Sequence, residues 1–261
     1  MKWKETTRAA SVNLASVVMS PTFILSVLLF FGVLFAEVIQ MALIRDTLAS
    51  DMGDAYFFNI SIHFGYYIYA APLLCSLATG GLFVNDSEAG FYRLRLMRSG
   101  RGGYRHGLWL GATVGGGLAL FLGALLFALS CALLFGPHYP ATSIATADGW
   151  LPVLEGLSGN WRYMLLNALL AFVFGMVWSG VGLTFTVLSP NRYVGVLAPF
   201  ILCFCLALLL PPALQPLEML VQGRWESFSL PMLFLYQGVL YLLALLWFSF
   251  AYDRRITHGQ G

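Results

Sequence analysis

Residues 83–105 read FVNDSEAGFYRLRLMRSGRGGYR and separate two long apolar segments. Five of the 14 basic residues of the chain fall within this stretch, after an acidic start at Asp86 and Glu88. A membrane-spanning helix needs about 20 consecutive, mainly apolar residues, and both flanking segments reach that length. The stretch therefore predicts two membrane-spanning helices joined by a basic, polar connection.

The composition extends this interpretation to the whole chain. Of its 261 residues, 59% are hydrophobic and 10% are charged, whereas soluble proteins carry about 25% charged residues. No segment between the apolar stretches is long enough for a soluble catalytic domain. We expect an all-α integral membrane protein with six transmembrane helices in a single domain, residues 1–261. The predicted spans are Thr22–Leu43, Ile62–Val84, Gly107–Phe135, Tyr163–Leu188, Tyr193–Leu210 and Pro231–Tyr252.

The basic residues are distributed unevenly between the two sides that six spans define. Eleven of the 14 lie on the side of the termini, and Arg45, Arg162 and Arg224 lie on the other side. Lys and Arg accumulate on the cytoplasmic side of membrane proteins. We therefore predict a multi-pass protein of the cell membrane with both termini in the cytoplasm.

Two segments outside the spans have the composition of membrane-associated structure. Residues 1–20 begin with Lys2, Trp3 and Lys4, and their scattered valines favour a helix lying in the membrane interface; the alternative is a disordered tail. Residues 211–230 hold three prolines among Leu, Met, Val and Trp and are too apolar for a free outer loop. Because non-helical backbone at membrane depth must be covered by protein or face a wet cavity, we expect re-entrant outer helices between spans five and six.

Residues 85–106 form the predicted cytoplasmic connection between spans two and three. Over residues 86–105, Phe91, Leu94 and Met97 recur at the spacing of an amphipathic helix, with arginines on another face. The arginines alone fit two roles, anchoring anionic lipid headgroups or docking a partner. The order of features favours docking, because an acidic residue and a glycine follow the end of one span and precede the amphipathic helix.

The same residues carry a resemblance to a known family. The chain reads Asp86-Ser87-Glu88-Ala89-Gly90 at the end of span two and Arg101-Gly102-Gly103-Tyr104 before span three. With the predicted topology, N-terminal interfacial helix and re-entrant segment, this resembles the permease subunits of type-2 ATP-binding-cassette (ABC) exporters. The chain departs from the family pattern at Arg98 and Gly100, where Pro and Ser are usual, and has Arg105 where a Lys is frequent.

The resemblance implies that residues 85–106 are a coupling segment whose helix sits in a groove of a separate ATPase subunit. Glu88 would cap or brace this helix, and the arginines would pair with acids of the ATPase. The chain has no G-x-x-x-x-G-K-[ST] motif, so ATP and Mg are expected on the partner and no cofactor on this chain. The implied ATPase-coupling residues are Asp86, Glu88, Gly90, Arg93, Arg98, Arg101 and Tyr104.

The resemblance also implies the function. The chain is expected to be a non-enzymatic permease subunit that exports a substrate together with an ABC ATPase and a second permease chain, identical or different. Apolar spans with few charges favour a hydrophobic or amphipathic substrate, such as a lipid, drug or peptide. Membrane lipids are expected partners and nucleic acids are not. Two alternatives stay open: a non-transport scaffold or sensor subunit, and an ATP-independent channel or carrier, although the chain has few of the repeats typical of carriers.

Small residues and one acid inside the spans are further candidates. Gly107, Gly111 and Gly115 recur every four residues in span three, which lets helix backbones approach closely. They serve either tight packing within the subunit or a helix pair that slides during transport. Glu37 lies in the outer half of span one, where an ionisable residue is a functional candidate. It either lines the translocation path, pairs with Arg45, or sits hydrated near the headgroups.

Metal and protease sites are not expected. All four cysteines lie in apolar segments at spacings unlike those of a zinc site, so we predict that they fill the core and that the chain binds no metal. Ser179 follows Trp178 and precedes a glycine, as in some intramembrane serine proteases, but such a site needs a His base on a neighbouring helix. Only His63 of the four histidines lies at a span, near its outer boundary.

Overall fold

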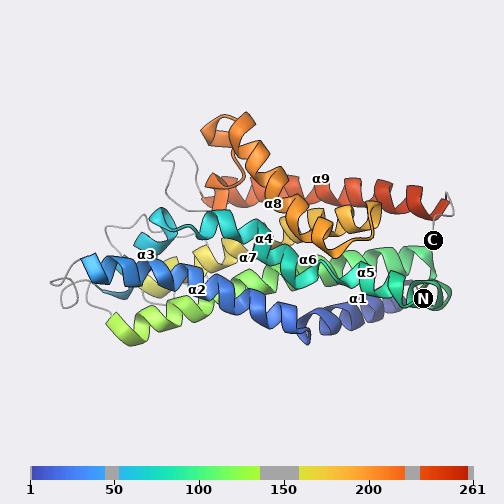
Figure 1. The fold of residues 1–261 in the computed structure, drawn as a ribbon, viewed down its shortest axis with the longest axis horizontal. Helices are drawn as coiled ribbons and strands as arrows, with labels where there is room; N and C mark the ends of the chain where they lie inside the picture. The colour runs from blue at the N-terminus through green and yellow to red at the C-terminus, as the bar shows by residue number, and fades with distance from the viewer. Residues whose placement is uncertain (1, 45–52, 136–158, 221–229, 258–261) are drawn as a thin grey trace.

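The computed structural model describes residues 2–44, 53–135, 159–220 and 230–257, and every regular element in these ranges is a helix. The helices form an elongated bundle, horizontal in Figure 1. This confirms the predicted all-helical class. The elements are α1 (Lys2–Val18), α2 (Pro21–Ile44), α3 (Asp54–Phe64), α4 (Tyr67–Thr79), α5 (Leu82–Glu88), α6 (Phe91–Phe135), α7 (Gly159–Leu188), α8 (Arg192–Leu209), the 3-10 helices η3 (Pro212–Leu214) and η4 (Glu218–Leu220), and α9 (Leu230–Thr257).

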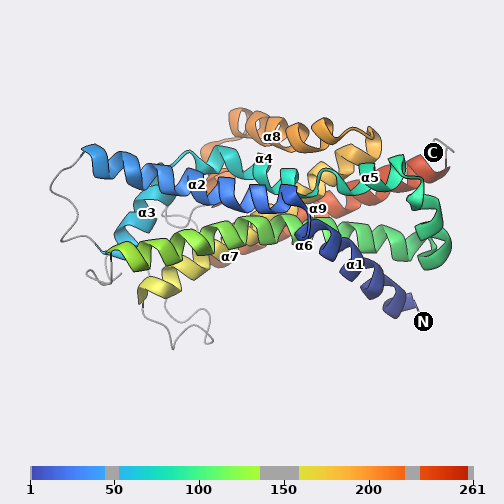
Figure 2. The ribbon, with the colours of Figure 1, turned by 60° about the horizontal axis from the view of Figure 1, so that its bottom comes forward.

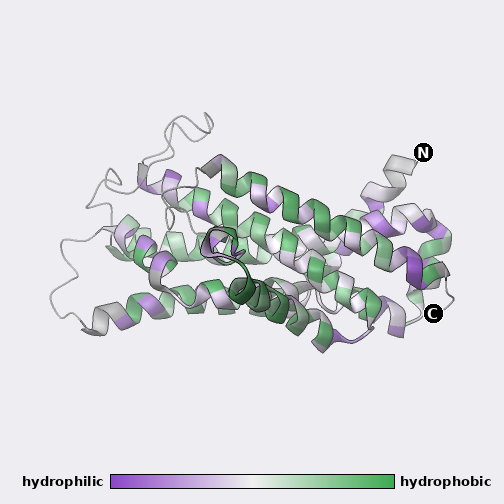
Figure 3. Ribbon diagram, turned by 90° about the horizontal axis from the view of Figure 1, so that it is seen from above, coloured by the Kyte–Doolittle hydropathy of each residue, from purple (hydrophilic) through white to green (hydrophobic). Residues whose placement is uncertain are grey.

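Within the described ranges, six helical stretches are long and apolar enough to cross a membrane, as the sequence predicts. Figure 3 shows that apolar residues occupy most of the middle of the bundle and that polar residues gather toward its two ends. Such a band is what the hydrocarbon core of a bilayer requires. The six stretches are Pro21–Gln40, Tyr67–Glu88, Leu94–Phe135, Asn160–Leu188, Arg192–Leu209 and Pro231–Ile256.

The second span begins later than the prediction. Ile62 belongs to α3, and the extended backbone of Gly65 (φ −76°, ψ 154°) separates α3 from α4. A Cβ atom on Gly65 would lie 2.2 Å from the carbonyl oxygen of Ser61, so the break requires glycine. The hydrophobic pattern does not reveal the break, because apolar residues continue on both sides of it.

The helices divide into a central and a peripheral group. In α7, 72% of the most apolar part of the span is buried inside the bundle. The corresponding share is 17% in α8 and 22% in α9. α7 packs against α6, α8 and α9, and α4 packs against α2, α6, α7 and α8. The two peripheral helices, α8 and α9, consequently turn most of their apolar side chains outward, as lipid-facing helices do.

Both ends of the described chain lie toward the same end of the bundle (Figures 1 and 2). This arrangement agrees with an even number of crossings. The predicted N-terminal helix is present as α1, which leads directly toward α2 in Figure 2. Its location in a membrane interface stays a prediction.

The predicted re-entrant segment is described as far as residue 220, where it contains η3 and η4. Leu217 and Leu220 are buried, and the hydroxyl of Tyr236 in α9 donates a hydrogen bond to the carbonyl oxygen of Leu214 at 2.7 Å. This part of the connection is therefore packed against the bundle. The re-entrant course itself stays a prediction, because residues 221–229 lie outside the described ranges.

Candidate functional site

Two glycines divide the predicted coupling segment into separate helical pieces. Gly90 (φ 68°) follows α5, and Gly100 (φ 69°) interrupts α6. Both have a left-handed φ that glycine adopts without the steric cost other residues carry, and a Cβ on either would meet no atom within 4 Å. The backbone conformation, rather than crowding, therefore requires glycine. Residues 91–99 form a short helix of their own, here called the 91–99 helix, where the sequence predicts one continuous helix over residues 86–105.

Asp86, near the end of α5, holds the 91–99 helix to the bundle. Its side chain is only 8% exposed and accepts an ion-pair hydrogen bond from Arg95 Nη1 at 2.8 Å. The same carboxylate oxygen accepts a hydrogen bond from the hydroxyl of Tyr104, which is buried, at 2.9 Å. Hydrogen bonds to an ionised group are about twice as strong as those between neutral groups. Two predicted site residues, Asp86 and Tyr104, thus meet each other inside the chain.

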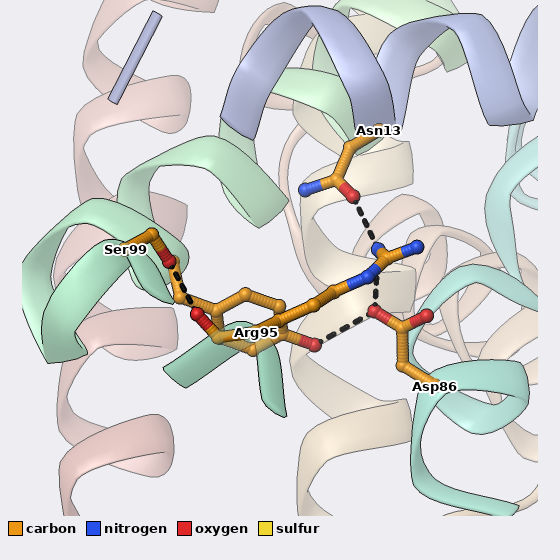
Figure 4. Close-up of polar contacts among 5 residues, drawn as sticks. Asn13, Asp86, Arg95 and Ser99 are labelled. Carbon is orange, nitrogen blue, oxygen red and sulfur yellow. Dashed lines mark hydrogen bonds and ion pairs between the residues drawn. The ribbon is translucent and has the colours of Figure 1, made fainter. Parts of the chain in front are cut away.

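Arg95 connects this cluster to α1. Its Nη1 atom also donates to Asn13 Oδ1 at 2.8 Å, and Asn13 is only 2% exposed. Figure 4 shows the Arg95 side chain with Asn13 on one side of its guanidinium and Asp86 on the other. The sequence places Arg95 on the basic face of the predicted helix together with Arg98 but does not distinguish it as a site residue, and it gives Asn13 no role. The one available signal is that Asn13 interrupts a stripe of small and apolar residues, Ala9 and Val17, at helical spacing.

The glycine stripe of α6 packs against α1. A Cβ atom added to any of three glycines would lie closer to α1 than real Cβ atoms approach other atoms, so even a methyl group would push the two helices apart. The order of the pairs shows that α1 and this part of α6 run in the same direction. The sequence predicts close packing here but does not identify α1 as the partner. The pairs are Gly107 with Ala9 (2.6 Å), Gly111 with Asn13 (2.5 Å) and Gly115 with Val17 (2.6 Å).

Two further ion pairs join the same end of the bundle to α8 and α9. Arg105 in α6 contacts Asp253 in α9 at 2.9 Å. Glu88 in α5 contacts Arg192 in α8 at 3.2 Å, and both side chains are more than half exposed. Exposed pairs contribute little to stability because water screens them. The ion pair of Glu88 is therefore with α8, rather than with the coupling helix that Glu88 is predicted to cap or brace.

The outward side of the 91–99 helix and the turn after it is apolar and basic. Phe91 is 55% exposed, Leu94 53% and Met97 75%. The side chains of Arg98 and Arg101 are exposed and form no hydrogen bond or ion pair within the described part of the chain. These five residues are called the docking face below. A groove of about 490 Å³ on this side is lined by the three apolar residues together with Arg95 and Arg98.

The other predicted coupling residues have different roles. Asp86 and Tyr104 are internal contacts, and Gly90 shapes the turn. The side chain of Arg93 lies outside the described part of the structure. The predicted set therefore mixes residues that hold the 91–99 helix with residues that it presents to the outside.

Glu37 is buried beside the break between α3 and α4. It is 6% exposed, and its Oε1 atom accepts a hydrogen bond from the backbone N–H of Tyr66 at 3.2 Å. The first N–H groups of a helix lack partners within it and carry partial positive charge, so a carboxylate there stabilises α4. The predicted alternative partner, Arg45, lies outside the described residues. A contact with a transported substrate stays a prediction.

The cysteines only partly follow the prediction that all of them fill the core. Cys75, Cys131 and Cys203 are buried, but Cys205 is exposed on α8. Hydrophobicity alone does not separate Cys203 from Cys205, because outward positions on a lipid-facing helix are also apolar. In the described ranges, no three His, Cys, Asp or Glu side chains are grouped as a metal site requires.

Comparisons with known proteins leave the chain without an assigned family. No protein-family model matches it, and no curated protein matches it either.

Proposed function

We propose that the chain is the membrane-spanning permease subunit of an ATP-driven ABC exporter. It moves a hydrophobic or amphipathic substrate, such as a lipid, drug or peptide, in a pair with a second permease chain. A separate ABC ATPase binds ATP and Mg and supplies the energy. The chain lies in the cell membrane, with its termini and the 91–99 helix on the cytoplasmic side.

The observation that carries the proposal is the docking face. Three large apolar side chains are exposed at the end of the bundle where the termini lie, together with two arginines that pair with no described residue. Aromatic residues, Met and Arg are enriched in protein–protein interfaces, where apolar anchors fill pockets of the partner. A groove in a soluble ATPase would bury Phe91, Leu94 and Met97, and acids around that groove would pair with the arginines.

The polar cluster, formed by Asn13, Asp86, Arg95 and Tyr104, supports a mechanical role for the 91–99 helix. Asp86 connects this helix to α5 and, through the hydroxyl of Tyr104, to the long part of α6. Gly90 and Gly100 are the points at which the backbone direction changes. In the proposed cycle, ATP binding draws two ATPase subunits together and the 91–99 helices move with them. The cluster then transmits this movement to spans two and three, which opens a path between the two permease chains.

The composition of the spans supports the proposed substrate class. α7 and α8 contain no acidic residue, and the outward surface of α8 is built of side chains such as Leu197, Ile201 and Leu208. A path between such helices has few groups that could replace the water around an ion or a sugar. It is suited to cargo that already prefers an apolar environment.

The first test is purification of the tagged chain from its native membranes in mild detergent, with mass spectrometry and an ATPase assay on the eluate. The proposal expects a co-purifying P-loop ATPase. A second permease-like chain in the eluate would indicate a heteromer. An intact, folded chain without an ATPase would instead favour a stand-alone channel or a scaffold.

The second test reverses the charge of three arginines in the predicted coupling segment, residues 85–106. The Arg93→Glu/Arg98→Glu/Arg101→Glu variant is expected to lose the ATPase or to hydrolyse ATP without transport, because acids of the partner would then be repelled. Arg254→Glu is the control, since Arg254 is also an exposed arginine but lies in the last turn of α9. Unchanged ATP-driven transport in the triple variant would rule out the coupling role.

A further inference from the structure

A second groove lies between α1 and the 91–99 helix, and Tyr104 of α6 also lines it. Its volume is about 660 Å³. Arg8, Val12 and Asn13 line it from α1, and Arg98 and Ser99 line it from the 91–99 helix. The groove therefore depends on the position of α1 against α6, which the glycine stripe and the Arg95–Asn13 hydrogen bond both hold.

The groove carries an excess of positive charge. Arg8, Arg95 and Arg98 are its charged lining residues, and none of the acidic side chains that the structure describes lines it. Arg95 is neutralised by its ion pair with Asp86. Arg8 and Arg98 form no side-chain hydrogen bond or ion pair with any described residue, so two cations facing one groove lack a counter-charge.

A side-chain hydrogen-bond donor faces the same space. The bond from Arg95 occupies Asn13 Oδ1 and so fixes the orientation of the amide, which leaves the NH₂ group of Asn13 without an acceptor in the described structure. In Figure 4 this nitrogen points away from Arg95, on the side where Ser99 lies. Asn13 lines the groove and is 2% exposed, so a group bound there can accept a hydrogen bond from this donor.

Two guanidinium groups and an amide donor around one space match the chemistry of a phosphate group, whose oxygens accept several charge-assisted hydrogen bonds. The surroundings indicate which phosphate. Val12 is half exposed in the groove, and exposed apolar residues continue along the chain at Val18, Met19 and Ile24 into span one. A phosphate in the groove could thus carry acyl chains that lie against this surface.

We propose that this groove is a phosphate-binding site filled by the headgroup of an anionic phospholipid. The site requires no ATPase and lies on the α1 side of the 91–99 helix, so it is separate from the proposed coupling role. Arg98 contributes to both surfaces, whereas Arg8 belongs to the groove alone. Arg8 is therefore the residue to test.

The experiment is native mass spectrometry of the delipidated full chain in non-ionic detergent, titrated with phosphatidylglycerol or phosphatidylcholine. Arg8→Gln is expected to weaken phosphatidylglycerol binding about tenfold, because one charged hydrogen-bonding partner is lost. Arg101→Gln removes the same charge at the same end of the bundle but does not line the groove, and it should bind as the wild type does. Arg98→Gln should reproduce the Arg8→Gln result, and circular dichroism confirms that each variant is folded.

Glycerol 3-phosphate in place of lipid identifies the source of the phosphate. Binding of the lipid alone supports the phospholipid site. Binding of glycerol 3-phosphate with equal affinity and the same dependence on Arg8 would assign the site to a soluble phosphate ester and overturn the lipid assignment. Equal losses in Arg8→Gln and Arg101→Gln, or no loss in either, would overturn the site itself.

Discussion

The contact between Arg95 and Asp86 allows the polar cluster to be tested by its effect on stability. We consider Arg95→Met, which preserves length and removes the charge. A hydrogen bond to a charged group contributes about 1.5–3 kcal/mol. Arg95 makes two such bonds, to Asp86 and Asn13, from a side chain that is 33% exposed. Solvent screening places each bond at the lower end of that range, so the expected loss is about 3 kcal/mol.

A double-mutant cycle isolates the ion pair within this loss. Asp86→Asn keeps an oxygen that can accept from Tyr104 and from Arg95 but removes the negative charge, so the charge-assisted part of the bond with Arg95 should appear as a coupling energy of about 1 kcal/mol. The free energy of unfolding of the wild type, both single variants and the double variant is measured in mixed detergent micelles by circular dichroism. Glu88→Gln with Arg192→Met is the matched control, because both side chains of that pair are exposed and little coupling is expected. Additivity of Asp86→Asn and Arg95→Met within about 0.5 kcal/mol would refute the cluster.

Three further predictions concern the glycines and the topology. Gly111→Leu should release α1 and expose it to limited proteolysis, because even its Cβ would lie 2.5 Å from that of Asn13; Gly32→Leu, which meets nothing within 4 Å, should leave the cleavage pattern unchanged. Gly100→Ala should lower the unfolding free energy by about 1 kcal/mol owing to its positive φ, whereas Gly102→Ala, helical and uncrowded, should raise it by about 0.5–1 kcal/mol; equal shifts would contradict the assigned backbone. The Arg101→Cys variant, made in a chain from which Cys205 has been removed, should react with a membrane-impermeant maleimide in inside-out vesicles and not in intact cells. The opposite labelling pattern would show that the orientation is the reverse of the predicted one.

Hydrophobicity alone was sufficient to predict the six spans. Each predicted span overlaps one apolar helix of the described structure, because a bilayer selects length and hydrophobicity, and both are readable residue by residue. The break at Gly65 was not predicted, since part of its surroundings comes from another helix: a Cβ on Gly65 would lie 3.0 Å from Cγ of Glu37, whose carboxylate accepts from the N–H of Tyr66. Contacts between segments distant in the chain leave no local pattern.

The candidate site was predicted in its location but not in its internal contacts. The motif pointed to Asp86, Gly90 and Tyr104, and all three have a definite structural role. Arg95 was indistinguishable from the neighbouring arginines, because only the fold places it between α1 and α5. Asn13 lies 82 residues before Arg95. A polar residue among small residues on one helix face does not indicate which distant side chain it will bond.

The packing of α1 on the glycine stripe has a consequence for biosynthesis. α1 is translated first, but the glycines that receive it end at Gly115, nearly 100 residues after α1 ends at Val18. At about 5–20 residues per second, α1 waits on the order of 5–20 s before its partner surface exists. During that interval the glycines that Ala9, Asn13 and Val17 contact in the folded protein have not yet been synthesised. Assembly of this end of the bundle is therefore a late event, and the groove between α1 and the 91–99 helix forms only then, as does the contact of Asn13 with Arg95.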